Sequence, residues 1–115
     1  MENNLLKRYA VEYFKKFRDK DLGGLSDLYA DNIILKDWNG MWAGKEDVLN
    51  INADFFNCDF TIKINSIDVS IPRANINFDL TIGDTTTNVD DSIFFNNEYK
   101  ITNITAYLND NGTNQ

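Results

Sequence analysis

The sequence predicts one α+β domain in which helices pack on one face of a strongly curved, mainly antiparallel sheet. Apolar residues recur at helical spacing in the first half of the chain, whereas from residue 60 to 108 they alternate every second position. With 115 residues, 43% of them hydrophobic, the chain can bury one core but not two. We therefore expect a single domain over residues 1–108 and a polar tail over residues 109–115.

Two amphipathic helices are expected before the first strand. Apolar side chains between Leu5 and Phe17 recur every three or four residues, which places them on one helical face. Asp21 is suited to cap a second, short helix that Asp31 and Asn32 close. Both helices have an apolar side that the rest of the chain must cover.

A hairpin, a third helix and four strands are expected after them. Ile33 to Asp37 has the pattern of a strand, and Asn39-Gly40 is a dipeptide preferred in tight hairpin turns. Residues 45–56 then return to helical spacing. In the strand region the phase of alternation switches near Asn65-Ser66, which predicts a bulge or bend. A meander bent around helices encloses a cone-shaped hollow.

Charge and composition exclude several functions. A net charge of −7 and a pI near 4.4 argue against nucleic acid or an anionic membrane as a partner. With one cysteine and no histidine, the chain has no internal disulfide and no zinc site, and we expect neither metal nor cofactor. The first residues lack a basic flank and an apolar run, so we expect no signal peptide, no membrane anchor and a cytoplasmic location.

Two acids are expected to face the hollow. Asp37 follows Ile33 and Leu35 at a period of two, so its carboxylate shares their side of the strand. Asp91 alternates with the apolar residues of its own strand, whereas Asp90 belongs to the polar side. An acid on an apolar face is costly unless it is neutralised or hydrogen-bonded, which makes it a functional candidate. The alternatives are a turn residue that bonds local backbone for Asp37, and for Asp91 a one-residue bulge that exchanges the two acids.

Aromatic side chains supply the remaining candidates. Tyr13 lies on the apolar stripe of the first helix, where a phenol seeks a hydrogen-bond partner and could donate into the hollow. Tyr9 or Tyr29 fits the same pattern. The candidates for a ligand-binding wall are Tyr9, Trp38, Trp42, Phe55 and Phe56. All of these aromatic residues also suit a place in the core or in an interface.

Short motifs follow one another in a fairly specific order: Asp19-Lys20-Asp21-Leu22, Leu28-Tyr29-Ala30-Asp31-Asn32, Asp37, Gly44-Lys45-Glu46, Ile93-Phe94-Phe95, Lys100-Ile101 and Ala106-Tyr107. By the order and spacing of these motifs, the chain resembles the nuclear transport factor 2-like superfamily over about residues 5–108. The resemblance is to the SnoaL-like and ketosteroid isomerase branch of that superfamily. The resemblance implies a cystatin-like cone, with N-terminal helices packed on the curved sheet, and a homodimer.

The resemblance also implies roles for three residues. A gapless match from the first helix to the first strand puts Tyr13 on the family's oxyanion-hole tyrosine and Asp37 on its catalytic base. The last hairpin puts Asp91 on the protonated acid that makes the second oxyanion contact. The implied reaction is proton abstraction next to a carbonyl. Trp38 replaces the family's usual proline after the base, and this bulky residue either blocks a steroid-sized ligand or forms the pocket rim. The lack of histidine excludes the histidine-dependent mechanisms of relatives.

Two classes of function are consistent with these residues. The first is an isomerase-type general acid/base enzyme that acts on a small apolar carbonyl compound. The alternative is a non-catalytic domain of the same fold that binds a small ligand or serves as a homodimeric scaffold. A metal ion held by Asp90 and Asp91 is disfavoured because adjacent strand residues face opposite ways.

Overall fold

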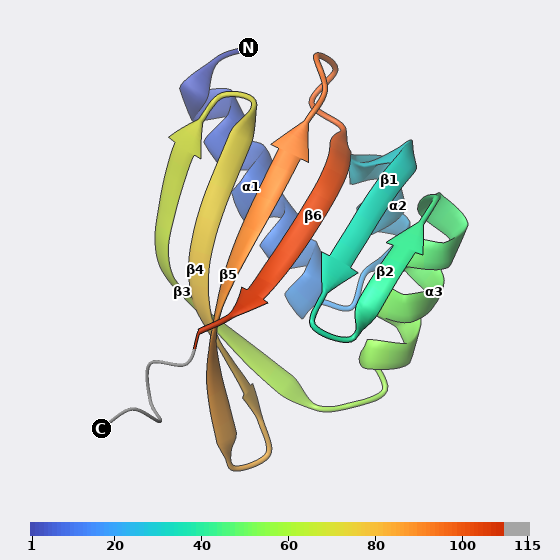
Figure 1. The fold of residues 1–115 in the computed structure, drawn as a ribbon, viewed down its shortest axis with the longest axis vertical. Coiled ribbons are helices and arrows are strands. Elements are labelled where there is room, and N and C mark those ends of the chain that lie inside the picture. Colours follow the sequence, from blue (N-terminus) through green and yellow to red (C-terminus); the bar gives the residue numbers. More distant parts are fainter. Residues whose placement is uncertain (110–115) are drawn as a thin grey trace.

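In the computed structural model of the chain, which describes residues 1–109, three helices lie on one face of a six-stranded sheet (Figure 1). The elements are α1 (Asn3–Arg18), α2 (Leu22–Leu28), β1 (Tyr29–Asp37), β2 (Gly40–Ala43), α3 (Lys45–Phe55), β3 (Phe60–Ser70), β4 (Arg73–Ile82), β5 (Thr85–Phe95) and β6 (Ile101–Leu108). The predicted α+β class is confirmed. Residues 110–115 of the predicted polar tail lie outside the described part of the chain.

The sheet has the strand order β2-β1-β6-β5-β4-β3. Every neighbouring pair is antiparallel except β1 and β6, which run parallel and join the first hairpin to the meander. The predicted change of phase corresponds to an irregular pairing between Ile64 and Ser66, where β3 shifts its register against β4. The strands twist strongly, so the sheet curls around α1 (Figure 1).

Helix α1 crosses the concave face of this sheet because its apolar stripe is buried there. Leu6, Ala10, Tyr13 and Phe14 are its buried residues, and the ring of Phe14 packs edge-on against Phe78 of β4 at 5.1 Å between centroids. Burying a side chain of this size contributes about 2 kcal/mol to stability. The predicted first helix is confirmed and is three residues longer than the apolar stripe indicates.

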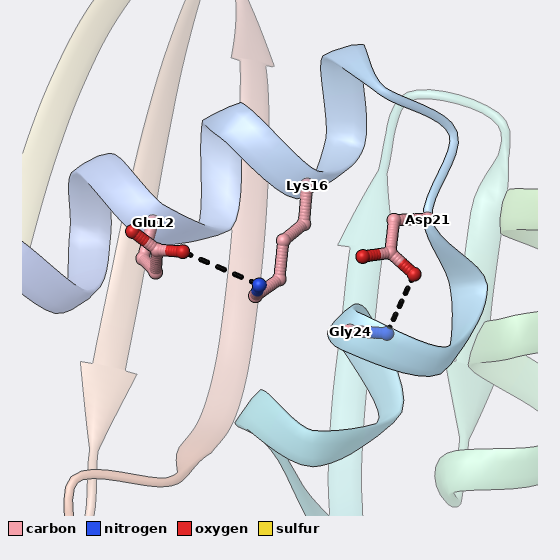
Figure 2. Close-up of polar contacts among 4 residues, drawn as sticks. All are labelled: Glu12, Lys16, Asp21 and Gly24. Atoms are coloured by element: carbon pink, nitrogen blue, oxygen red, sulfur yellow. Dashed lines mark hydrogen bonds and ion pairs between the residues drawn. The ribbon is translucent and has the colours of Figure 1, made fainter.

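Helix α2 begins where the sequence predicts. The Asp21 carboxylate accepts a hydrogen bond from the Gly24 backbone N–H at 2.9 Å, and Lys16 pairs with Glu12 at 3.2 Å nearby (Figure 2). A Cβ on Gly24 would lie 2.5 Å from the Asp21 carboxylate, so glycine permits this cap. The predicted end of the helix at Asp31 and Asn32 is wrong: α2 ends at Leu28.

The hairpin between β1 and β2 is confirmed, but its turn lies one residue earlier than predicted. Asp37 pairs with Gly40, so the two turn residues are Trp38 and Asn39. The Asp37 side chain accounts for the shift, because its Oδ1 accepts the backbone N–H groups of Asn39 at 2.7 Å and Gly40 at 3.2 Å. This places Asp37 at the last position of β1, beside the hollow.

The core lies between the helices and the concave face of the sheet. Its fully buried members with the largest side chains come from both layers: Tyr29, Phe14, Leu6, Leu25, Ile33, Ile76, Ile93, Ile101, Ile104, Val48 and Val89. None of the helices within residues 1–109 has both the length and the apolar character needed to cross a membrane.

Candidate ligand-binding cavity

The core is incomplete, because a cavity of about 400 Å³ remains between α1, α3 and the concave face of the sheet. Its wall is mostly apolar and includes Phe14, Phe17, Ile62, Phe78, Leu80 and Val89. A cavity of this volume is in the range that holds a small organic molecule. Tyr13, Asp37 and Asp91, which are far apart in the sequence, all line it.

Asp91 is the buried acid of the cavity. It lies on β5 between Val89 and Ile93, is 5% exposed, and its carboxyl has no hydrogen-bond partner within residues 1–109. Burial is the main cause that raises the pKa of Asp91 from 3.8 to about 8, and the nearby charges of Asp90 and Asp37 contribute to the same shift. At neutral pH Asp91 is therefore a neutral acid that can donate its proton into the cavity.

Tyr13 lies on α1, and its ring centroid is 6.4 Å from that of Tyr29 on β1. Burial raises the pKa of Tyr13 well above 10, and the neighbouring Tyr29 and Asp91 add to this effect. Burial also raises the pKa of Tyr29, whose hydroxyl donates to Asn52 Oδ1 on α3 at 2.6 Å. Both phenols remain protonated at any pH at which the protein is used, so they act as hydrogen-bonding groups only.

The two carboxylate oxygens of Asp37 have different environments. Its Oδ1 is held by the two backbone N–H groups of the hairpin turn, and Oδ2 has no hydrogen-bond partner in the part of the chain that the structure describes. The residue is half-buried and lines the cavity. The turn role that the sequence left open is therefore present, and it fixes the orientation of a carboxylate whose other oxygen is free.

The aromatic candidates divide into two groups. Trp38, Trp42 and Phe55 line the cavity, and Trp38, in the hairpin turn, is 47% exposed. Tyr9 and Phe56 do not line it. Tyr9 stacks on Tyr99 at 5.3 Å between ring centroids, and Phe56 packs against Phe17 at 4.9 Å.

Sequence reasoning did not single out Asn52 as a site residue. It is 5% exposed, lines the cavity and accepts the hydrogen bond from Tyr29. The signal was present, because Asn52 lies between Val48 and Phe55 on the apolar stripe of the third helix. A buried polar residue on such a stripe requires a partner.

The charge of the cavity wall is entirely negative. Asp37 and Asp54 carry this charge, the third acid, Asp91, is neutral at neutral pH, and no lysine or arginine is among the lining residues. Within residues 1–109 no group of three side chains is arranged to hold a metal ion. Such a wall disfavours anionic ligands and suits neutral ones.

Comparison with solved structures confirms the fold that the sequence suggests. A candidate ketosteroid isomerase from Kribbella flavida superposes with a TM-score of 0.86 at 15% identity, covering 94% of this chain and 80% of that one. A candidate SnoaL-like polyketide cyclase from Shewanella denitrificans has a TM-score of 0.81 at 15% identity, covering 91% and 90%. A protein from Silicibacter pomeroyi, described as having a cystatin-like fold, has a TM-score of 0.79 at 13% identity, covering 88% and 73%.

The chain thus has the cystatin-like fold of the nuclear transport factor 2-like proteins, in the form shared by SnoaL-like and ketosteroid isomerase-like structures. No protein-family model and no curated relative matches the sequence. At these identities the likeness defines the fold and leaves the activity to the residues of the cavity.

Proposed function

We propose that the protein is an isomerase-type general acid/base enzyme that acts on a small, neutral, mostly apolar carbonyl compound. One observation carries the proposal: a half-buried carboxylate, a buried neutral acid and a buried phenol, namely Asp37, Asp91 and Tyr13, line the same cavity. A surface acid and a core tyrosine are common, but an acid without a protein partner in an apolar cavity requires an explanation.

The chemistry follows from the two acids, whose environments differ. Asp37 Oδ2 takes a proton from the carbon next to the carbonyl, and the electron pair moves onto the carbonyl oxygen. Asp91, neutral because it is buried, donates a hydrogen bond to that oxygen, and Tyr13 supplies the second donor. Asp37 then returns the proton at another carbon of the conjugated system, so the product is an isomer of the substrate.

A ligand-binding domain without catalysis is the second candidate, and the hairpin turn favours it. The Asp37 carboxylate already accepts two backbone hydrogen bonds, which is a complete structural reason for an acid at this position. In that case the apolar cavity would bind a small neutral molecule without converting it, either in a single chain or in a homodimeric scaffold.

The two candidates are separated by Asp37→Asn, because asparagine keeps an oxygen for the turn but cannot take the proton. Assayed against a panel of unsaturated ketones, the enzyme should lose about 10²- to 10⁴-fold in kcat. Asp84→Asn, which changes an exposed acid outside the cavity, is the matched control and should keep full turnover. An unchanged rate in Asp37→Asn would contradict the proposed role of Asp37, and ligand binding without any turnover in the wild-type protein would establish the non-catalytic alternative.

A further inference from the structure

Asp91 brings a carboxyl into the cavity for which the described chain supplies no counter-charge. The side chain is 5% exposed and lines the cavity, and neither a hydrogen bond nor an ion pair joins it to any residue from 1 to 109. No lysine or arginine lies in the cavity wall, and the sequence contains no histidine. A buried carboxyl that the protein leaves unpaired can pair with a positive charge that a ligand brings.

Much of the remaining wall consists of aromatic rings, which also attract cations. A connected group of rings from α1, α3 and β4 lines the cavity, with neighbouring centroids 5.0 to 5.8 Å apart: Tyr13, Phe14, Phe17, Phe55 and Phe78. The negative face of an aromatic ring attracts a cation that lies within about 6 Å of its centroid. An organic cation in the cavity would therefore meet favourable partners in the rings and in the carboxyl groups of the wall.

The shape and composition of the cavity favour an organic cation over a metal ion. A hard metal cation requires several oxygen ligands around one point, and within residues 1–109 no group of three side chains is arranged in that way. The cavity of about 400 Å³ instead has room for an ammonium group together with an apolar body. Quaternary ammonium ions fit such a wall because they need negative charge and aromatic surface but no hydrogen bonds.

We propose that the cavity binds apolar organic ammonium ions, with Asp91 in its charged form as their counter-ion, as a class of ligand separate from the carbonyl substrate. The inference uses the same cavity as the proposed function but does not depend on catalysis. The two ligand classes exclude each other, because a carbonyl compound requires the proton of Asp91 and an ammonium ion requires its absence. An ammonium ion is therefore also a competitive inhibitor of the proposed reaction.

The pH selects between the two ligand classes, because the pKa of Asp91 is about 8. The other titratable groups around Asp91 or in its cavity are Tyr13 on α1, Tyr29 and Asp37 on β1, Asp54 on α3 and Asp90 on β5. The two phenols stay protonated, and none of these groups is a cation. A bound ammonium ion stabilises the ionised form of Asp91, so one proton leaves for the solvent as the ligand enters. Binding of the cation therefore tightens as the pH rises toward 8.

Two ligands of the same shape test the proposal: benzyltrimethylammonium, and neopentylbenzene, in which a neutral carbon replaces the charged nitrogen. In the wild-type protein the Kd of the cation should fall by about tenfold or more between about pH 6 and about pH 8 and level off above that, whereas the Kd of neopentylbenzene should not fall.

Asp91→Asn removes the proposed counter-ion and keeps the shape of the side chain. At about pH 8.5 this variant should bind the cation at least about tenfold more weakly than the wild-type protein does, and without dependence on pH. Neopentylbenzene, measured at about pH 6 where Asp91 is neutral, should bind both proteins within about twofold. Asp84→Asn, which removes an exposed acid outside the cavity, is the control for net charge and should bind both ligands like the wild-type protein.

Cation binding that is independent of pH, or equally tight in Asp91→Asn, would place the cation away from Asp91 and overturn the proposal, as would a wild-type protein that binds no cation up to about 10 mM. If Asp91→Asn fails to fold, a ¹³C NMR titration of the wild-type protein decides. Benzyltrimethylammonium should lower the pKa of the aspartate that titrates near pH 8 to about 7 or below, and an unchanged titration would overturn the proposal. Cation binding of this kind in a protein without turnover would retain this inference and reject the proposed enzyme, whereas turnover without cation binding would do the reverse.

Discussion

Two adjacent acids on β5, Asp90 and Asp91, lie in opposite environments on the two faces of one sheet. Asp90 faces the convex side, where its oxygens accept from Asn77 at 2.7 Å and Asn109 at 2.8 Å. Asp91 faces the cavity without a partner in the described chain, and burial raises its pKa to about 8. The same residue type is thus a satisfied anion on one face and a neutral donor on the other.

The convex face shows why the difference is one of environment. A network of side-chain amides and acids covers it, consisting of Asn65, Asn77, Asp79, Asn88, Asp90 and Asn109. Hydrogen bonds from Asn88 and Asn65 lower the pKa of Asp79, the opposite direction from Asp91. Amide donors therefore hold Asp79 of the convex face in its charged form, and the apolar wall holds Asp91 in its neutral form.

The largest effect we predict is on the pH dependence of stability. Because the folded-state pKa of Asp91 is about 8 and its ordinary value is 3.8, the folded protein keeps a proton that the unfolded chain releases. Its contribution is fully present below about pH 4 and is lost as the pH rises toward 8, at most about 6 kcal/mol in total. Asp91→Asn should flatten the free energy of unfolding across this window, as measured by urea denaturation. Asp90→Asn should reduce the slope only in part, because it removes one charge that raises the pKa of Asp91 and leaves burial, the larger cause, in place. Equal slopes in all three proteins would contradict the contrast.

The second effect is on turnover. Asp91→Leu removes one hydrogen-bond donor from the cavity and should lower kcat by about 10²-fold, whereas Asp91→Asn retains an N–H donor and should lose less. In the wild-type protein, activity should fall as the pH rises through about 8, because ionised Asp91 no longer donates. A pH–rate profile of Asp91→Asn without that alkaline limb would assign it to Asp91. If the alkaline limb remains in Asp91→Asn, it reports the ionisation of another group.

The third effect is confined to the convex face. Asn77→Ala removes donors to Asn88 and Asp90 in a partly buried network and should lower the free energy of unfolding by about 1 to 2 kcal/mol. Turnover and ligand binding should not change, because Asn77 does not line the cavity. A loss of activity without a loss of stability would show that the two faces are coupled.

The smallest effect concerns a third acid, Asp21, whose carboxylate accepts a backbone hydrogen bond. Its loss gives a reference value against which the effects at Asp90 and Asp91 can be compared. Asp21→Ala should cost about 1 kcal/mol of stability through the loss of the α2 cap. Gly24→Ala should cost a similar amount, because the added Cβ meets the same carboxylate. The double variant should cost little more than either single one, and fully additive losses would mean that the glycine acts independently of the cap.

Much of the fold is predictable because local patterns agree with it. The stripe from Leu5 to Phe17, the cap at Asp21 and the alternation that changes phase near Asn65 correspond to α1, α2 and the shifted register of β3. The errors arise where side chains or distant strands override a local preference. Asp37 moved the hairpin turn one residue earlier, and β1 begins at Tyr29 because it pairs there with Ile101 of the last strand.

The site was predictable only in part, for the same reason. Alternation along a strand indicated that Asp91 faces inward, because that pattern depends on neighbours within one segment. The contact of Tyr29 with Asn52 depends on how β1 and α3 meet, which no local pattern encodes. The catalytic roles of Tyr13, Asp37 and Asp91 and the ligand-binding roles of the aromatic residues remain predictions.

The protonation state of the Asp91 carboxyl tests the proposed chemistry most directly. Both the role of Asp91 as a hydrogen-bond donor and the contrast between the two faces of the sheet depend on it. A ¹³C NMR titration of aspartate side chains, with Asp91→Asn used to assign the resonance, follows its protonation in the free protein. We predict that Asp91 titrates near pH 8, far above Asp79, whose pKa is lowered by hydrogen bonds. A titration of Asp91 near pH 4 would mean that it is charged at neutral pH, and the proposed acid/base chemistry would be contradicted.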